Sequence, residues 1–285
     1  MHILKEIEAT RRAAGAIRAA GETLGLVPTM GKLHEGHLSL VRAARARCDQ
    51  VAVTIFVNPT QFGPGEDLDA YPRSPDADLS LLRAEGVDLV FMPVVEAMYE
   101  ADSATRVRVS GISEVLCGAH RPGHFDGVAT VVAKLLNILP ADAAFFGEKD
   151  YQQLLIIKKM VADLNMPIEI VGCPLVREPD GLAMSSRNVR LSTEHRTQAV
   201  ALSRALFAAR DRVGEGITST AELVREIRQE IESAGPCEID YVEIVDPQDL
   251  SSIERVTDAA RICLAVRIGD CRLIDNIAVT CATAL

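Results

Sequence analysis

No block of lysine and arginine residues occurs in this 285-residue sequence, and its formal net charge is −10. Proteins that bind duplex nucleic acid need a basic face to neutralise the phosphates. The sequence therefore argues against a nucleic-acid partner. A few local cations and the N-termini of helices would still suffice to bind a small polyanion.

The sequence also lacks long apolar runs. No stretch approaches the roughly 18 residues of a membrane span, and segment 1–21 is charged and helix-like, without the apolar centre of a signal peptide. No membrane partner is expected. The seven cysteines are odd in number and form no C-x-x-C pair, so we expect reduced thiols and a cytoplasmic protein. They are Cys48, Cys117, Cys173, Cys237, Cys263, Cys271 and Cys281.

Up to about residue 175 the chain alternates short apolar runs with amphipathic segments. Its 48% of hydrophobic and 25% of charged residues are typical of a packed globular protein. Strands are predicted at 24–29, 51–57, 88–92, 143–146 and 168–171, and helices at 37–48, 75–86, 128–139 and 151–164. This alternation predicts an α/β protein with a Rossmann-like, doubly wound parallel sheet. Such sheets bind ligands beyond the carboxyl ends of their strands.

The pattern changes at 172–181, a segment with two prolines and two glycines. Beyond it, predicted helices at 193–213 and 219–234 precede predicted strands at 239–245, 261–268 and 272–279. We interpret the segment as a hinge. The sequence therefore predicts two domains, one of residues 1–175 and a smaller α+β domain of residues 176–285.

The segment VPTMGKLHEGH lies where the first of these strands passes into a helix. His34 and His37 are three residues apart, so both imidazoles can share one helix face. Free N–H groups and the dipole at a helix start favour phosphate, and Gly36 lets a flat ring or a phosphate approach the backbone. Two surface histidines, or half of a zinc site, are the alternatives. Zinc needs a third ligand, and no Cys or His stands nearby in sequence.

Polar residues follow two further predicted strands. After 51–57, the carboxamides of Asn58 and Gln61 are suited to hydroxyls and carboxylates, although turn chemistry alone would explain Asn58. After 143–146, Lys149 would lie on the same rim as the histidines and could clamp a phosphate. Asp150 with Gln153 three residues later also matches a capping box, which would explain both without a ligand.

The segment GLAMSSRN at 181–188 comes just after the predicted hinge. Two hydroxyls followed by a guanidinium can grip a triphosphate, and Arg187 can stabilise the charge that develops on departing pyrophosphate. A glycine-flanked loop between domains can also close over a ligand. Alone the segment would be typical of a solvated loop. Together with H-x-G-H it indicates an adenylyl-transfer enzyme.

In their order, the motifs VPTMGKLHEGHLSLV, VNPTQFG, FFGEKDYQQL and DGLAMSSRN resemble those of the pantothenate synthetase (pantoate–β-alanine ligase) family, from about residue 24 to 191. The resemblance implies an enzyme that condenses (R)-pantoate with β-alanine, using ATP and Mg²⁺, to give pantothenate, AMP and pyrophosphate through a pantoyl adenylate. It also implies a homodimer, an ATP- and pantoate-binding first domain, and a C-terminal lid domain that carries the MSSRN loop.

The resemblance assigns roles to individual residues. His37 would donate a proton to the departing pyrophosphate, and His34, Lys149 and Arg187 would be the other catalytic residues. Gln61 and Gln153 would bind substrate, with Asn58 a further candidate. The ATP-binding residues would be Met30, Gly31, Lys32, Leu33, His34, Glu35, Gly36, His37, Gly147, Glu148, Lys149, Asp150, Val176, Met184, Ser185, Ser186 and Arg187.

Two positions depart from the family's pattern. Cys117 and Ala77 stand where relatives often carry an acidic residue. If residue 117 shapes the β-alanine end of the site, amine affinity is altered. If residue 77 helps to hold Mg²⁺, Asp78 must do so through water. His124 is a candidate for the site wall, with a capping or core histidine as the alternative.

Two other functions fit an H-x-G-H protein. One is a nucleotidyltransferase that acts on a phosphorylated substrate, and the other is a non-catalytic nucleotide sensor. A phosphorylated acceptor should demand arginines, so the amides of Gln61 and Gln153 favour a hydroxy acid. A sensor would bind ATP without exchanging pyrophosphate into it.

Overall fold

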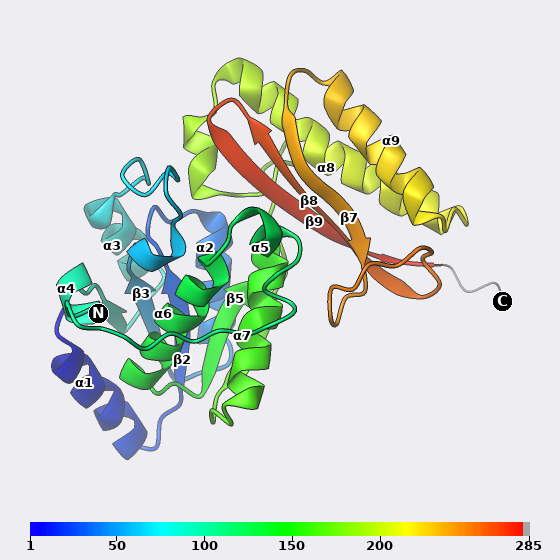
Figure 1. Ribbon diagram of the computed structural model, residues 1–285. Coiled ribbons are helices and arrows are strands. Elements are labelled where there is room, and N and C mark those ends of the chain that lie inside the picture. The colour runs from blue at the N-terminus through cyan, green and yellow to red at the C-terminus, as the bar shows by residue number, and fades with distance from the viewer. Residues whose placement is uncertain (282–285) are drawn as a thin grey trace.

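A computed structural model describes residues 1–281 and shows a parallel sheet flanked by helices, followed by a second, smaller sheet (Figure 1). The first sheet has six parallel strands in the order β1-β4-β3-β2-β5-β6. They are β1 (His2–Leu4), β2 (Leu24–Thr29), β3 (Gln50–Ile55), β4 (Leu89–Phe91), β5 (Ala143–Gly147) and β6 (Glu169–Cys173). The predicted doubly wound α/β fold is confirmed.

Helices cover both faces of this sheet. They are α1 (Ile7–Ala19), α2 (Glu35–Arg45), α3 (Pro75–Ala84), α4 (Val95–Met98), α5 (Cys117–His120), α6 (His124–Ile138) and α7 (Tyr151–Asp163). Apolar residues of α1, α6 and α7 pack on one face and those of α2 and α3 on the other (Figure 1). Leu26 of β2 therefore faces the first core and Val27 the second, and both are fully buried. Burial on both faces explains the continuously apolar strand sequences.

The C-terminal part is an antiparallel sheet of β7 (Glu238–Val245), β8 (Ala259–Ile268) and β9 (Cys271–Thr280). The helices α8 (Thr193–Gly214) and α9 (Thr220–Ser233) pack on one of its faces around a separate core (Figure 1). On its other face, Tyr241, Cys263 and Ala265 join the core of the first sheet. The smaller sheet thus packs against the first part of the chain through this face.

The structure differs from the sequence-based expectations mainly at short elements. Residues 1–21 were expected to be helical, but His2–Leu4 forms the edge strand β1, which is too short to show a periodicity. α6 begins at His124 rather than at 128, after Gly123 with φ 81°. Short 3-10 turns at η1 (Pro59–Gln61), η2 (Glu148–Asp150) and η3 (Ser186–Arg190) were not predicted. Among residues 1–281, no helix is long and apolar enough to cross a membrane.

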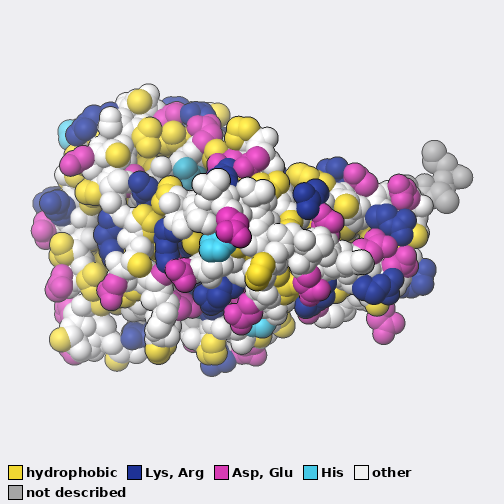
Figure 2. Space-filling model, turned by 90° about the horizontal axis from the view of Figure 1, so that it is seen from above, with side chains coloured by type: hydrophobic (Ala, Val, Ile, Leu, Met, Phe, Trp, Pro, Cys, Tyr) yellow, Lys and Arg dark blue, Asp and Glu magenta, His cyan; other side chains and the backbone are white. Residues whose placement is uncertain are grey.

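The surface carries charges of both signs. On the face shown in Figure 2, lysine and arginine side chains alternate with aspartate and glutamate, and no broad patch of one sign covers it. Many of these charges are paired at the surface, as Arg204 is with Glu230 at 2.5 Å.

Candidate active site

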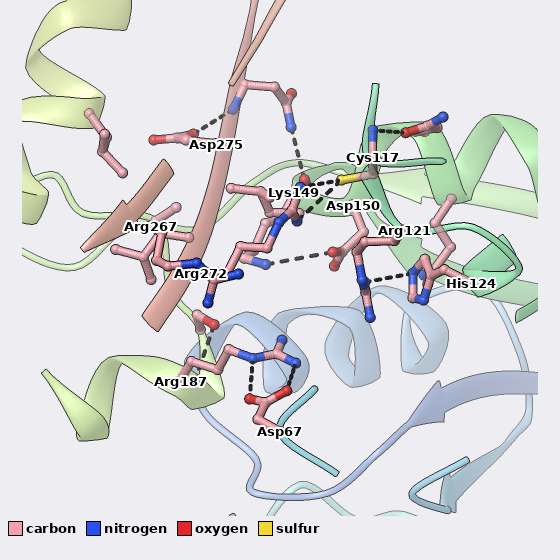
Figure 3. A pocket seen from close by; sticks show the side chains of 18 of the residues that line it. Asp67, Cys117, Arg121, His124, Lys149, Asp150, Arg187, Arg267, Arg272 and Asp275 are labelled. Atoms are coloured by element: carbon pink, nitrogen blue, oxygen red, sulfur yellow. Dashed lines mark hydrogen bonds and ion pairs between the residues drawn. The ribbon is translucent and has the colours of Figure 1, made fainter. Parts of the chain in front are cut away.

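Two adjoining cavities, of about 450 Å³ and 230 Å³, open between the carboxyl end of the parallel sheet and the C-terminal part. They form one cleft, because both are lined by Arg121, His124, Lys149, Asp150, Gln153, Ser185 and Arg187. Figure 3 shows Arg187 with Asp67 on one wall and Arg121 with His124 on another. The cleft lies where a doubly wound sheet positions its ligands.

The imidazoles of His34 and His37 meet at the start of α2. His34 is the N-cap residue of the helix and His37 lies in its first turn. Their ring centroids are 4.1 Å apart, and both residues line the smaller cavity. The structure thus brings both histidines to one ligand-sized space at a helix N-terminus, where an anion is favoured.

Burial keeps both imidazoles neutral. Burial, helped by the nearby ammonium of Lys149, lowers the pKa of His34 to about 4, and burial with His34 and Lys149 nearby lowers that of His37 to about 3. The backbone N–H of His34 donates to Nδ1 of His37 at 3.3 Å, so the neutral His37 ring carries its proton on Nε2. Nδ1 of His34 is buried and has no hydrogen-bond partner among the described residues.

Gly36 makes this packing of rings possible. A Cβ at this position would lie 3.0 Å from Nδ1 and Cε1 of His34 and 3.7 Å from Cβ of Met184. The missing side chain therefore admits the His34 ring, and it also lets the 184–187 loop approach α2.

Asn58 follows β3 and is 1% exposed. Its Nδ2 donates to Oε1 of Gln61 and to the carbonyl of Gly127, each at 3.1 Å. Its Oδ1 accepts from Thr60 Oγ1 at 3.0 Å and from the Tyr99 hydroxyl at 2.9 Å. All hydrogen-bonding positions of the amide are occupied. The expected substrate contact from Asn58 is therefore not supported, and its contact with Gln61 orients that residue instead.

Gln61 has the freer amide of the two. Among residues 1–281, its Nε2 donates only to the thioether of Met30, at 3.1 Å, and sulfur is a weak acceptor that a ligand oxygen would replace. Its backbone carbonyl accepts from Nδ1 of His124 at 2.7 Å. Arg121 donates to Nε2 of His124 at 3.0 Å, and burial lowers the pKa of His124 to about 4. Neutral His124 thus lies in the site wall and supports Gln61.

Lys149 and Gln153 project from the segment after β5 and line both cavities. Nζ of Lys149 is 3.6 Å from Oδ1 of Asp150. The predicted capping box is wrong: Asp150 is the N-cap residue of α7, but its side chain makes no capping hydrogen bond. Its φ of −95° and ψ of 59° depart from the extended backbone that a side-chain cap requires. The Gln153 side chain has no hydrogen-bond partner among the described residues and is available to a ligand.

The loop 184–187 lines the smaller cavity along its whole length. It is tied to the β2–α2 segment, because Oγ of Ser186 donates to the carbonyl of Lys32 at 3.0 Å. Nε and Nη2 of Arg187 donate to the two oxygens of Asp67, each at 2.8 Å (Figure 3). This leaves Nη1 of Arg187 as the nitrogen available to a ligand.

The residues expected to contact a nucleotide divide into two groups. Met30, Gly36, Gly147, Val176 and the loop 184–187 line the smaller cavity with the histidines and Lys149. Another group lines neither cavity: Gly31, Lys32, Leu33, Glu35 and Glu148. Glu35 pairs with Arg42, and Glu148 pairs with Arg261. Their carboxylates are therefore directed away from the phosphate site.

Asp78 holds the loop that precedes the histidines. Its carboxylate is 2% exposed and accepts from the backbone N–H groups of Lys32 at 2.8 Å and Leu33 at 2.9 Å, and from the Ser74 hydroxyl at 3.1 Å. This fixes a turn in which Gly31 and Lys32 have φ of 82° and 50°. Both oxygens are occupied, so the expected contact of Asp78 with Mg²⁺ through water is not supported.

Cys117, where an acidic residue was expected, also lies in the larger cavity. Its Sγ is 3.4 Å from Nη1 of Arg272 and 3.3 Å from the Tyr241 hydroxyl. Arg272 pairs at 2.6 Å with Asp240. The guanidinium thus finds its negative partner on its own sheet, not at position 117.

The sequence missed several residues that support the site. Asp67 and Asn276 contact Arg187 and Lys149 across 120 and 127 residues of chain, and no local pattern marks them. Arg121 was detectable, because it stands three residues before His124.

These features define the class of protein. The larger cavity is lined by six lysine or arginine residues and five aspartate or glutamate residues, although the whole chain is acidic. Paired imidazoles at a helix N-terminus, an ammonium and a guanidinium border one cleft of a doubly wound sheet. Such a site belongs to an enzyme that transforms a nucleotide.

Comparison with known proteins gives the family. The family model for Pantoate-beta-alanine ligase matches residues 2–278. The pantothenate synthetase of Moorella thermoacetica is 53% identical over 277 residues, 97% of this chain and 98% of the relative. That of Cereibacter sphaeroides is 52% identical over 277 residues, 97% of this chain and 99% of the relative.

Solved structures agree. The pantothenate synthetase of Thermus thermophilus has a TM-score of 0.92 and 47% identity, covering 97% of this chain and 99% of that one. The pantoate–β-alanine ligase of Francisella tularensis, complexed with β-γ ATP and β-alanine, has a TM-score of 0.83 and 34% identity, covering 97% of each chain. The chain belongs to the pantoate–β-alanine ligase family and is an enzyme of that family.

Proposed function

We propose that the cleft condenses (R)-pantoate with β-alanine in two steps. The pantoate carboxylate first attacks the α-phosphorus of ATP, giving pantoyl adenylate and pyrophosphate. The β-alanine amine then attacks the acyl carbon, giving pantothenate and AMP. A carboxylate cannot react directly with an amine because its leaving group would be oxide, and AMP is a far better one.

The observation that carries this proposal is the convergence of His34, His37, Lys149 and Arg187 on one cleft. The first step brings an anionic carboxylate to an anionic triphosphate, so the site must offset their repulsion and hold them in line. Lys149 and Arg187 supply positive charge, and the imidazoles supply N–H donors. In a water-excluded site, loss of one such donor costs on the order of 10²–10³ in rate.

His37 is suited to assist the departing pyrophosphate. Its Nε2 proton is free, because Nδ1 accepts from the backbone of His34. The neutral ring donates this N–H to a phosphate oxygen, and the charge of the bound triphosphate favours its protonation. His34 lies beside it, and the N–H of its neutral ring can donate to the same phosphate.

The substrate acid fits beside Gln61 and Gln153. Both amides face the cleft, and each can bond the hydroxyl groups of pantoate. The adjoining wall is apolar and suits the two methyl groups of the acid. It is formed by Phe56, Val128, Val131, Val132 and Leu135.

Magnesium would enter as the counter-ion of ATP. Among residues 1–281, no group of three or more His, Cys, Asp or Glu is arranged to hold a metal. Mg²⁺ in phosphate sites commonly takes one or two carboxylates, together with phosphate oxygens and water. Asp150 lines both cavities and its side chain is 46% exposed, so it fits as that carboxylate. The ion would neutralise charge on the triphosphate.

Three organisational features belong to the same proposal. Residues 1–175 form the ATP- and pantoate-binding domain, and residues 176–285 form the lid domain, with the hinge at 172–181. The protein is a cytoplasmic homodimer. Cys48, Cys117, Cys173, Cys237, Cys263 and Cys271 are free thiols, as a reducing compartment permits. Sedimentation equilibrium tests whether the protein is a dimer.

The test is isotope exchange between pyrophosphate and ATP, measured with pantoate and without β-alanine. Exchange that requires pantoate is expected, because the first step alone is reversible. His37→Ala should lower the exchange rate by about 10²–10³ with an unchanged circular dichroism spectrum. The control His2→Ala, at an exposed histidine of β1, should exchange like the unaltered protein.

Two outcomes would overturn the proposal. ATP binding without any exchange would indicate a nucleotide sensor. Exchange that depends on a phosphorylated acid rather than on pantoate would indicate a nucleotidyltransferase.

A further inference from the structure

The C-terminal sheet contacts the Lys149 segment through one buried amide. Asn276 of β9 is 5% exposed, and its Nδ2 donates to the carbonyls of Glu148 and Lys149, each at 2.9 Å. Its Oδ1 accepts from Nε of Arg261 at 2.8 Å. Both N–H donors of the amide are directed at two consecutive backbone carbonyls of η2.

Arg261 of β8 completes the contact. It is 8% exposed, and its Nη2 donates to Oε2 of Glu148 at 3.0 Å. Its guanidinium lies over the ring of Tyr151, 3.9 Å from the centroid. The charge of Arg261 is thus compensated by Glu148, and its Nε fixes which side of the Asn276 amide faces η2. The C-terminal sheet therefore contacts η2 through the backbone carbonyls of Glu148 and Lys149 and through the side chain of Glu148.

This contact matters because η2 carries Lys149, whose side chain lines the cleft. η2 is a single 3-10 turn between the end of β5 and the start of α7, and such a turn contributes few hydrogen bonds of its own. The Lys149 side chain lines both cavities and faces the two imidazoles. Holding its carbonyl fixes the backbone from which the side chain extends into the cleft. A misplacement of about 1 Å in such a group can cost up to roughly 10² in rate.

We propose that Asn276, oriented by Arg261, is a positioning residue for the reaction. It fixes the backbone of Lys149 so that the ammonium faces the phosphates of ATP. The C-terminal sheet then contributes to the chemistry, beyond covering the cleft. This rests on the proposed role of Lys149. A purely structural contact between the two sheets is the alternative, and it predicts lower stability without an effect that depends on Lys149.

A double-mutant cycle separates these two accounts. Asn276→Ala should lower kcat/KM for ATP by about tenfold, and Lys149→Ala by about 10²–10³. In the Lys149→Ala background, Asn276→Ala should change kcat/KM by less than about twofold, because its effect runs through the missing ammonium. A further tenfold loss in the double variant would overturn the proposal, and so would an unchanged kcat/KM in Asn276→Ala.

The matched control is Tyr151→Phe. The Tyr151 hydroxyl donates to the carbonyl of Pro247 at 2.8 Å, so it joins the same two parts without touching Lys149. Phenylalanine keeps the ring under Arg261. This variant should lower the melting temperature and leave kcat/KM unchanged. A loss of kcat/KM equal to that of Asn276→Ala would show that any loosening of the contact has this effect, which would overturn the assignment.

Two further measurements keep the cycle decisive. If Asn276→Ala does not fold, Arg261→Lys replaces it, because it keeps a positive charge and loses the Nε donor to Asn276. It should give a roughly threefold loss that also disappears in the Lys149→Ala background. The same cycle on the Kd of ATP, measured by calorimetry, should be equally non-additive. That readout does not depend on pantoate, so a failure of the proposed reaction is distinguished from a failure of the positioning role.

Discussion

The β2–α2 segment and the η2 segment reach the same cleft, but they are held there differently. In β2–α2, His34 bonds His37 three residues away, and Gly36 between them admits the ring. In η2, Lys149 is fixed by Asn276, 127 residues further along the chain. Arg187 likewise depends on Asp67, 120 residues earlier. The imidazoles are placed mainly by their own segment, whereas the cations are placed by distant ones.

This difference separates two kinds of sensitivity. A locally built motif depends on helix spacing and on the absence of one Cβ. A remotely held cation depends on how the C-terminal part packs on the parallel sheet. Perturbing that packing should therefore affect stability first, and perturbing the motif should affect activity first.

The largest effect is expected at Arg177, in the segment that joins the two parts. Arg177 donates to both oxygens of Asp275 at 2.6 and 2.9 Å, and the Asp275 side chain is 1% exposed. Arg177→Ala leaves that carboxylate buried without its ion-pair partner and should lower the free energy of unfolding by about 3–5 kcal/mol. Denaturant titration measures it. The control Arg108→Ala loses an exposed partner, Glu114, and should cost at most about 1 kcal/mol. Equal losses of stability in the two variants would contradict the view that ion pairs between distant residues hold the C-terminal part in place.

A smaller effect is expected from acid. The pKa of His37 falls from 6.5 in the unfolded chain to about 3 in the folded one, because the ring is buried. Between these values the unfolded state binds the extra proton, so the free energy of unfolding falls as pH falls. From pH 7.5 to 5, His37 alone should contribute a loss of about 2 kcal/mol.

Denaturant titrations at the two pH values measure this loss. His37→Gln should remove it, and His2→Gln, at an exposed histidine, should leave the pH dependence unchanged. An unaltered slope in His37→Gln would show that this ring is not held neutral.

The smallest effect concerns the motif itself. Gly36→Ala places a Cβ 3.0 Å from the His34 ring, which must move by a few tenths of an ångström. The rate of exchange between pyrophosphate and ATP should fall about tenfold, while the free energy of unfolding changes little. Gly15→Ala is the matched control, since its Cβ meets nothing within 4 Å in α1 and should stabilise the helix by about 0.5–1 kcal/mol. Full exchange in Gly36→Ala would show that the imidazole pair tolerates displacement.

The same contrast explains what the sequence alone could predict. The strands around β2 and β3 were found because uniformly apolar runs between turns are typical of buried parallel strands. Gln61, Lys149 and the histidines, which line the cleft, could be predicted as candidates because they follow such strands. The edge strand β1 was not predicted because a strand of three residues is too short to show a periodicity.

The candidate residues that the structure does not support share a physical cause. Asn58 and Asp78 were assigned ligand contacts by their chemistry, but both are buried. Asn58 bonds the Gly127 carbonyl and the Tyr99 hydroxyl, and Asp78 accepts from the N–H groups of residues 32 and 33. Residue type shows what a side chain can bond, and only the packed chain shows what it does bond. For the same reason Asp67 and Asn276, which contact Arg187 and Lys149, could not be recognised from the sequence.

The most direct measurement is a crystal structure with pantoate and a non-hydrolysable ATP analogue. The account predicts phosphate oxygens within hydrogen-bond distance of Nε2 of His37, Nζ of Lys149 and Nη1 of Arg187, with pantoate between Gln61 and Gln153. A triphosphate bound outside the reach of these three groups would contradict it.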